Sequence, residues 1–374
     1  MKQPIVALQH CRAYSAGHID PVLQQIWDAA VMPDLFGKRV LVKPNILSDA
    51  PPSKAVTTHP EVLASLLRLL LDLGAKPMVG DSPAIHTASF TGRRSGLRTV
   101  CDELGVPWAD FLDGTAETAE TVSGRNRIYR VSRHALECDC IVSVPKLKTH
   151  KLMFYTGAVK NLMGVIPALG KSSCHLKYRN SRSFARFLAE LCSALPPVIA
   201  VADGITAMEG PGPNSGFPRT LGMLASSADC AALDVAASAG MGYDPREVPL
   251  CRAMHAGSLT LALSPGDITY PLHTPEQFAP GDFKLIDTAQ RDIPLWNFIG
   301  PRILRLLSRQ EGPAVMPERC IACGKCALIC PNGSAAEHAA GEYRINLRTC
   351  IRCWCCHEVC PADAVAAIHP GKQH

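Results

Sequence analysis

Eight cysteines near the carboxyl terminus recur at intervals that suit iron–sulfur chemistry. The segment CIACGKCALICP is followed thirty residues later by CIRCWCCHEVCP, and each reads C-x2-C-x2-C-x3-C-P. With this spacing three cysteines of one segment bind a 4Fe-4S cluster, and the cysteine before proline binds the other cluster. The pattern therefore predicts two 4Fe-4S clusters. The expected ligands are Cys320, Cys323, Cys326 and Cys360 for cluster 1, and Cys350, Cys353, Cys356 and Cys330 for cluster 2.

Zinc binding and disulfide bonding fit these cysteines less well. Structural zinc is usually held by two separated pairs of ligands, and disulfide frameworks belong to small secreted chains. Cys353, Cys356 and His357 also match the haem-attachment pattern C-x-x-C-H, but the repeat already requires both cysteines. Cys355 has no place in the repeat, so we expect a packed or spare thiol there.

Polar residues also collect where apolar segments end. The runs RVLVKPN, PMVGDSP, DCIVSVPKLKTH and PVIAVADG are apolar and then finish in polar side chains. Because helical segments separate them, they predict an α/β fold with a mostly parallel sheet and helices on both faces. Ligands bind at the carboxyl ends of strands in such sheets. The candidate ligand-binding residues are Lys43, Asn45, Asp81, Ser82, Lys146, Lys148, His150 and Asp203.

One segment concentrates positive charge. Residues 141–189 contain six Lys, three Arg and no Asp or Glu, whereas the whole chain carries a net charge of only +5. This concentration of positive charge predicts an anionic small-molecule ligand. Its lysines alternate with uncharged residues in PKLKTHKLMFYTGAVKNLMG, which favours a cleft lining over the alternative of a solvated basic surface. The segment adds Lys160, Asn161 and Lys171 to the candidates.

Nucleic acid and nucleoside triphosphates are not favoured as partners of the basic segment. Its few aromatic residues form no recognisable stacking platform, and no helix-turn-helix or RNA-binding motif is present, so we expect no nucleic acid. The segment GVIPALGKSS resembles a phosphate-binding P-loop, but it has five residues between its glycines instead of four and contains a proline. Nucleotide hydrolysis is therefore not expected.

The histidines near these segments each have two candidate roles. In TTHP, Thr58 or His59 is expected to cap a helix, either alone or while also contacting the anion beside Lys43. His150 and His175 flank the basic segment and are candidate catalytic proton donors, or else packed histidines. A further alternative is an additional metal bound by His59, His150 or His175.

Length and composition suggest several domains in a reducing compartment. The 374 residues are 47% hydrophobic and divide, by pattern, into an α/β domain (1–290), a helix and linker (291–313) and a two-cluster domain (314–374) of small α+β type. Eight further cysteines are scattered upstream, which is typical of free thiols. Without a signal-peptide segment or an apolar run of membrane length, we expect a cytoplasmic protein with no membrane contact.

Several local signals place individual elements. Asp20 with Pro21 predicts a helix over 20–30, and Asp244 with Glu247 predicts a helix over 245–256. Other helices are expected at 61–73, 183–194, 229–239 and 293–310, the last broken near Pro301. The loop EGPGPNSGFP is expected to form a wall of the ligand cleft. Asp229 and Asp234 are expected to cap the start of the helix at 229–239 and to support it.

The motifs KPN, TTHP, GDSP, PKLKTH, TGAVKNLMG and EGPGPNSG, in this order, resemble the DUF362 family. The resemblance covers about 40–239, and the chain then continues into a ferredoxin-like two-cluster segment. The family was defined by sequence before any function was assigned, so the resemblance supplies no substrate and no catalytic residue. Relatives that carry the same module imply electron delivery as a shared theme.

The sequence therefore predicts an iron–sulfur oxidoreductase that passes single electrons to an anionic molecule in a lysine-rich cleft. No flavin or nicotinamide motif such as G-x-G-x-x-G is present, so the electron donor or acceptor is expected to be an external protein. The cluster module should lie against the mouth of the cleft. The alternative is a non-catalytic electron carrier or assembly adaptor whose α/β domain binds a partner protein or a cofactor.

Overall fold

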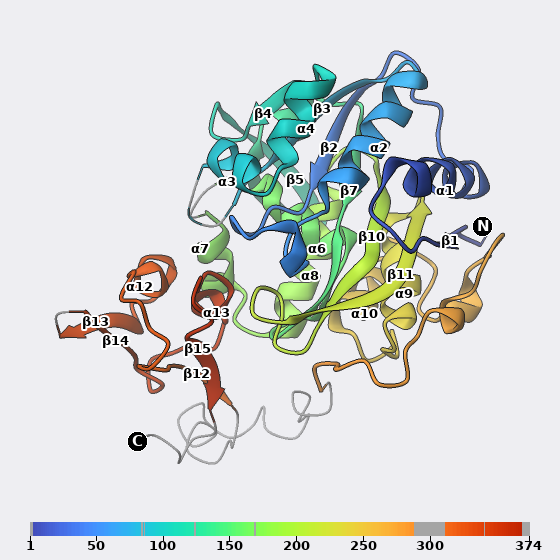
Figure 1. Ribbon diagram of the computed structural model, residues 1–374. Coiled ribbons are helices and arrows are strands. Elements are labelled where there is room, and N and C mark those ends of the chain that lie inside the picture. The colour runs from blue at the N-terminus through green and yellow to red at the C-terminus, as the bar shows by residue number, and fades with distance from the viewer. Residues whose placement is uncertain are drawn as a thin grey trace.

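Among the residues that the structure describes, nine strands form one sheet (Figure 1). The structure is a computed structural model that describes residues 3–83, 85, 87–122, 125–167, 170–287, 311–339 and 341–368. Along the sheet the order is β1, β11, β10, β7, β2, β3, β4, with β8 beside β10 and β9 beside β8. The strand bounds are β1 Ala7–His10, β2 Arg39–Pro44, β3 Lys76–Asp81, β4 Trp108–Asp110, β7 Cys140–Val144, β8 Lys146–His150, β9 Phe154–Thr156, β10 Val198–Glu209 and β11 Phe217–Ser227.

The centre of this sheet is parallel. β2 pairs in parallel with β3 and β7, β3 with β4, and β7 with β10. β11 and β1 extend one edge in antiparallel fashion. The predicted mostly parallel sheet is confirmed, and its buried apolar strands follow from helices that cover both faces.

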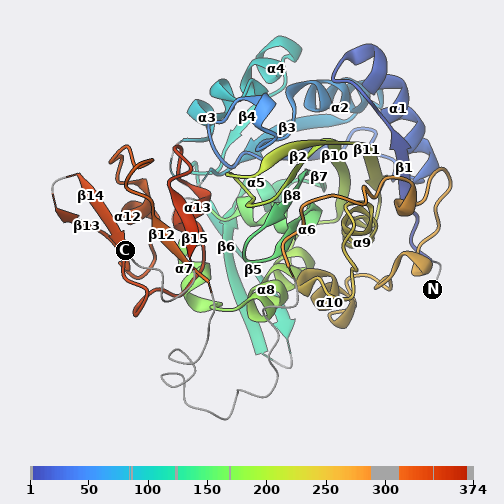
Figure 2. The same cartoon turned by 60° about the horizontal axis from the view of Figure 1, so that its bottom comes forward.

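Helices pack on both faces of the sheet (Figure 2). Val40 and Val42 of β2 belong to the core under α1, α2 and α4, while Leu41 belongs to the core under α6, α8, α9 and α10. This alternation is the period of two expected of a strand. The helix bounds are α1 Ala16–Ala29, α2 Pro60–Asp72, α3 Ala88–Arg94, α4 Leu97–Leu104, α5 His134–Glu137, α6 Ala158–Asn161, α7 Gly170–Lys177, α8 Ser181–Ser193, α9 Cys230–Gly240 and α10 Pro249–Ala256.

Two predicted helix starts are wrong. α1 begins at Ala16, and Asp20 lies inside it, 2.9 Å from Arg68 of α2; the turn before Asp20 is helical because it buries Ile19. α10 begins at Pro249, since Asp244 accepts a hydrogen bond from Arg246 N in a preceding turn. The helices expected at 61–73, 183–194 and 229–239 are confirmed within two residues at each end.

Pro145 divides the strand that the sequence predicts over 139–150. Proline has no N–H to donate, so the pairing of β7 stops there and the chain continues as β8. The Pro145 carbonyl instead accepts a hydrogen bond from Asp203 N at 2.9 Å. β8 then runs parallel to β10, with Lys146 opposite Asp203 in the middle of β10 and Lys148 opposite Met208 near its end.

Residues 311–368 form a small cluster module with short helices and hairpins beside the sheet (Figure 1). Its elements are β12 Gly312–Val315, α12 Lys325–Ile329, β13 Ala335–Ala339, β14 Glu342–Ile345, α13 Cys355–Glu358 and β15 Val365–Ile368. A separate hairpin of β5 Thr115–Val122 and β6 Arg125–Ser132 lies between α4 and α5 in the chain. The helix expected at 293–310 falls outside the described residues.

No helix in the described part of the chain combines the length and the apolar character needed to cross a bilayer.

Replacing Asp229 by Ala should lower the free energy of unfolding by about 1–2 kcal/mol, because Asp229 caps α9. Its carboxylate accepts hydrogen bonds from Ala231 N and Ala232 N at 3.0 and 2.8 Å, as predicted for a capping residue. Asp229→Asn keeps an acceptor and should lose much less. Urea unfolding of the full, cluster-loaded chain measures both, and equal losses for Asn and Ala would contradict the capping role.

Candidate functional site

Lys43, at the carboxyl end of β2, is fully buried in a polar network. Its ammonium lies 2.7 Å from Asp81 of β3 and 3.1 Å from Asn161 Oδ1. Asp81 also accepts hydrogen bonds from Ile46 N and Ser82 N, both at 2.8 Å. Burial lowers the pKa of Lys43, and the Asp81 carboxylate opposes that shift. The pair is therefore a buried salt bridge with its remaining lone pairs satisfied.

Lys146 forms a second buried ion pair on the neighbouring strands. It lies 2.7 Å from Asp203 of β10 and donates to Tyr14 Oη at 2.8 Å. Asp203 also accepts from Tyr14 Oη and from His59 N, each at 2.9 Å. Burial lowers the pKa of Lys146, again against the pull of its carboxylate partner.

His59 is the residue of TTHP that caps α2. Its Nδ1 accepts from Glu61 N at 3.2 Å, and its ring stacks on Tyr14 with the centroids 3.6 Å apart. Thr58 Oγ1 instead donates to Val144 O at 2.6 Å and accepts from Asn45 N at 2.8 Å. Thr58 therefore holds the loop after β2 against the end of β7.

Lys148 differs from the other two buried lysines because its hydrogen-bond partners are neutral oxygens. Its ammonium donates to Asn45 Oδ1 at 2.8 Å and to Val56 O at 2.7 Å. Burial, followed by repulsion from Lys160, puts the pKa of Lys148 well below its ordinary value. Asn45 also donates to Asn161 at 3.3 Å, so Lys148 is joined to the network of Lys43.

The structure brings the predicted residues together but corrects their role as a cleft lining. Lys43, Lys146 and Lys148 are 0, 0 and 1% exposed, and none of them lines the larger described pocket. Lys146 and Lys148 alternate with uncharged residues because β8 passes through the interior. There a carboxylate or an amide oxygen from another part of the chain pairs with each ammonium. Lys171 lies nearby and donates to the carbonyl oxygens of Ser82 and Pro83.

A carboxylate of the cluster module, that of Glu358, lies beside His150, Lys160 and His175 at the edge of the sheet. Glu358 Oε1 lies 3.0 Å from His150 Nε2, though without good hydrogen-bond alignment. Burial alone would raise the pKa of Glu358, but His150, Lys160 and His175 together hold it below its ordinary value. The module therefore contributes a buried anion to the edge of the sheet where the sequence predicts an anionic ligand.

His150 and His175 are both neutral near pH 7. Burial lowers the pKa of His150 to about 3 and that of His175 to about 4. His150 Nδ1 accepts from Leu152 N and Met153 N, so its proton lies on Nε2, toward Glu358. His175 stacks on Phe184, and among the described residues its Nδ1 has no hydrogen-bond partner. Near pH 7 neither ring is a cationic acid, and the lone pair of His150 Nδ1 is already occupied by the two backbone N–H groups.

The module is fixed to the sheet edge by contacts that the sequence does not signal. His357 Nε2 lies 2.9 Å from Pro211 O, and Asn214 Nδ2 donates to Cys360 O at 3.1 Å. Trp354 is 2% exposed and packs in the core under α6 and α8, with Lys151 over its ring. Pro211 and Asn214 belong to the loop EGPGPNSGFP, so this loop contacts the cluster module.

The first four predicted ligands, Cys320, Cys323, Cys326 and Cys360, line one cavity of the module. A tetrahedral zinc would draw its sulfurs to about 2.3 Å from one point. Within the described residues, no three His, Cys, Asp or Glu side chains converge closely enough for a single ion. Four thiols around a cavity suit a cubane better than a single ion.

Cys356, one of the other four predicted ligands, has thiols of both predicted ligand sets near it. Burial and then the thiols of Cys353, Cys350, Cys330 and Cys326 raise the pKa of Cys356. Backbone N–H groups near the cysteines donate to sulfur, which is one way proteins tune cluster potentials. These donors are Ala335 N to Cys330, Arg352 N to Cys350 and Ala364 N to Cys360. Cys355 is buried, as expected of a packed thiol.

Comparison with known families matches two separate parts of the chain. The model described as "Domain of unknown function (DUF362)" matches residues 40–239, and the model described as "4Fe-4S binding domain" matches residues 313–334. A thylakoid-associated protein of Synechocystis sp. is 32% identical over 306 residues, covering 80% of this chain and 92% of that protein.

Other relatives match the module alone or resemble the fold in part. Pyruvate synthase subunit PorD of Methanocaldococcus jannaschii is 30% identical over 60 residues, or 16% of this chain and 70% of its own length. The delta subunit of NADH-dependent phenylglyoxylate dehydrogenase of Aromatoleum evansii is 40% identical over 53 residues, covering 14% of this chain and 56% of the subunit. The lactate racemase apoprotein of Thermoanaerobacterium thermosaccharolyticum has a TM-score of 0.39 at 13% identity, covering 62% of this chain and 55% of that one.

Replacing Lys43 by Met should lower the free energy of unfolding by about 3–5 kcal/mol, because Asp81 would be left as an uncompensated buried charge. The double variant Lys43→Met, Asp81→Asn removes both charges and keeps an acceptor for the backbone, so it should be more stable than Lys43→Met. Denaturant unfolding of both variants provides the comparison. A double variant less stable than the single one would show that the pairing is not the dominant interaction.

The buried His175 should make the protein less stable in mild acid. In the unfolded chain a histidine gains its proton below about pH 6.5, whereas native His175 stays neutral to about pH 4. The stability is therefore fully present above pH 6.5 and falls as the pH drops toward 4. His175→Phe keeps the stacking on Phe184 and should remove about 2 kcal/mol of the loss between pH 7 and pH 5.

Unfolding at several pH values measures this slope. The matched control is His255→Asn, at an exposed position, which should leave the slope as it is. An unchanged slope in His175→Phe would contradict the assignment.

Proposed function

Because the chain belongs to the DUF362 family and carries a 4Fe-4S binding domain, we propose that it is an oxidoreductase that uses two 4Fe-4S clusters. It passes single electrons through them to or from a small anionic molecule bound at the carboxyl edge of the sheet. The observation that carries the proposal is the insertion of Glu358, two residues from cluster cysteines, among the basic groups of that edge.

The cysteine repeat and the positions of its thiols support two clusters. Cys360 shares a cavity with Cys320, Cys323 and Cys326, which supports the crossed ligand pattern for cluster 1, and we assign Cys330 to cluster 2 on the same pattern. When bound, the clusters supply one electron at a time. The remaining chemistry belongs to the residues around them.

Burial and charge at the sheet edge support an anionic substrate. Lys148 donates only to neutral oxygens and Lys160 faces Glu358, and both lysines have pKa values lowered mainly by burial. Such a positive, water-excluded environment favours binding of negative charge. The lone pair of His150 Nδ1 is occupied by Leu152 N and Met153 N, so of the two neutral rings His175 is the candidate to take up a proton that accompanies electron transfer. Trp354 and Leu152 are buried and exclude water from this edge.

An external redox partner is part of the proposal. On the module, Ile321 and Leu328 are 65 and 61% exposed, and Cys323 between them in the chain is exposed as well. Apolar side chains beside a thiol ligand of cluster 1 would give a partner protein a docking surface close to the cluster. The same surface also fits the alternative function, a non-catalytic carrier or assembly adaptor.

The two functions make different demands on the sheet edge. A carrier needs only the exposed face of the module, whereas an oxidoreductase also needs the small molecule. Lys146→Ala and Lys148→Ala are poor tests of anion binding, because both side chains are buried in networks that hold the strands together.

Anaerobic iron analysis tests the cluster count. The loaded protein should contain about eight iron atoms per chain. Cys356→Ser should lose roughly half of this iron and the electron paramagnetic resonance signal of cluster 2. The adjacent Cys355→Ser is the matched control and should keep all of it. Four irons in the parent protein, or equal losses in the two variants, would refute the two-cluster assignment.

A further inference from the structure

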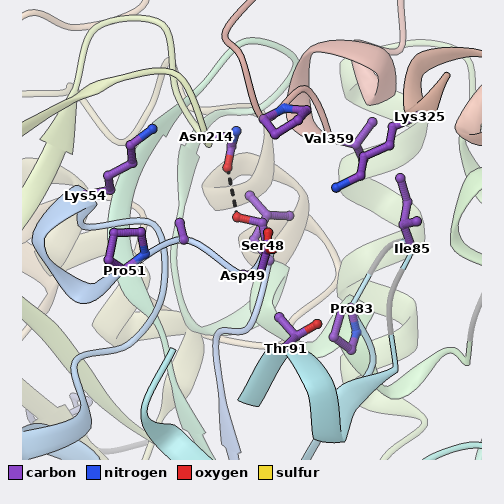
Figure 3. A pocket seen from close by; sticks show the side chains of 13 residues that line it. Ser48, Asp49, Pro51, Lys54, Pro83, Ile85, Thr91, Asn214, Lys325 and Val359 are labelled. Atoms are coloured by element: carbon purple, nitrogen blue, oxygen red, sulfur yellow. Dashed lines mark hydrogen bonds between the residues drawn. The ribbon is translucent and has the colours of Figure 1, made fainter. Parts of the chain in front are cut away.

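A pocket lies at the junction of the α/β domain and the cluster module (Figure 3). Its cavity volume is about 190 Å³. One side is formed by the loop after β2, the end of β3 and helix α3, and the other by Asn214 and the module. Its lining residues are Leu47, Ser48, Asp49, Ala50, Pro51, Lys54, Pro83, Ile85, Thr91, Asn214, Lys325, Val359 and Pro361.

The pocket lies beside cluster 1. Lys325, Val359 and Pro361 are the immediate chain neighbours of the cluster ligands Cys326 and Cys360. Adjacent Cα atoms are about 3.8 Å apart, so a molecule in the pocket lies close to the sulfurs that hold this cluster. Pockets at domain junctions are common positions for small ligands.

A buried hydroxyl in the wall lacks a partner within the described part of the chain. Thr91 of α3 is 0% exposed and lines the pocket, and no described group forms a hydrogen bond with its Oγ1. Buried polar groups are nearly always paired, so this hydroxyl points to a missing acceptor. By contrast, Asn214 is already hydrogen-bonded at both ends of its amide: its Oδ1 accepts from Ser48 Oγ at 3.0 Å and its Nδ2 donates to Cys360 O. Asn214 shapes the wall, and Thr91 offers the free donor.

Charge and size limit what fits. Figure 3 shows Lys54 and Lys325 on opposite sides of the pocket, while Asp49 is its carboxylate. Two cations and one anion leave a net charge of +1, and the ammonium of Lys171 lies just behind Pro83. The volume corresponds to about six water molecules at liquid density. Prolines and aliphatic side chains make up the rest of the lining.

We infer that this pocket binds a small organic carboxylate, with its negative charge toward Lys325 or Lys54, an oxygen accepting from Thr91, and its carbon skeleton against the prolines and Val359. A nucleotide is too large, and a bare inorganic anion leaves the apolar wall without contacts. That such a ligand exchanges electrons with cluster 1 rests on the proposed function, but its binding does not.

Isothermal titration of the full, anaerobically loaded protein with acetate, pyruvate, succinate and inorganic phosphate tests the inference. At least one carboxylate should bind more tightly than phosphate. Thr91→Val, which keeps the shape but removes the hydroxyl, and Lys325→Met, which keeps the aliphatic stem, should each weaken that binding by about tenfold. Ala50→Phe fills the pocket and should abolish it.

The controls separate binding from folding and from electron transfer. Lys54→Met lies on the α/β domain, away from the cysteines, so a loss of binding there cannot come from a damaged cluster. Lys76→Met, an exposed lysine at the start of β3, should bind like the parent protein. The inference is overturned if no carboxylate binds, if phosphate binds equally well, or if the pocket variants bind like the parent. An unchanged iron content in those variants would leave the two-cluster proposal standing.

Discussion

Burial of positive charge at the carboxyl edge of the sheet is the constraint that organises this molecule. Three lysines end or follow the central strands, and each must be compensated because an isolated ammonium in the interior is very costly. Asp81 compensates Lys43 and Asp203 compensates Lys146. Lys148 has only neutral oxygens, Asn45 Oδ1 and Val56 O. These partners tie β2, β3, β8 and β10 together where the sheet meets the cluster module.

The same constraint explains how the module is held. At this edge Lys160 of α6 supplies the positive charge, beside the neutral rings of His150 on β8 and His175 on α7, and Glu358 brings the opposite charge from α13. Trp354 adds an apolar anchor in the core of the α/β domain. Charge complementarity favours one orientation, and the buried aromatic ring adds apolar contact.

Local patterns in the sequence predict the strands and the ligands of the clusters, because both depend on short-range spacing. Apolar runs such as 39–45 become central strands, and four of the predicted ligands, Cys320, Cys323, Cys326 and Cys360, line one cavity. The pairing of Lys43 with Asp81 was not predictable as a pairing, since it depends on how β2 and β3 lie in register. The basic residues therefore looked like a cleft lining in the sequence, although they are internal. Glu358 and Thr91 carry no local signal at all, because their roles arise only from docking and packing.

Helix α13 is a single short helix that serves two purposes at once. Cys355–Glu358 places a cluster thiol, Cys356, and the docking side chains of His357 and Glu358 within four consecutive residues. Metal binding supplies the folding free energy of small modules of this kind. If Cys356 holds a cluster as proposed, ordering of α13, and with it the cover over His150, would depend on cluster insertion. Cofactor insertion and closure of the inner surface of the α/β domain would then be one event.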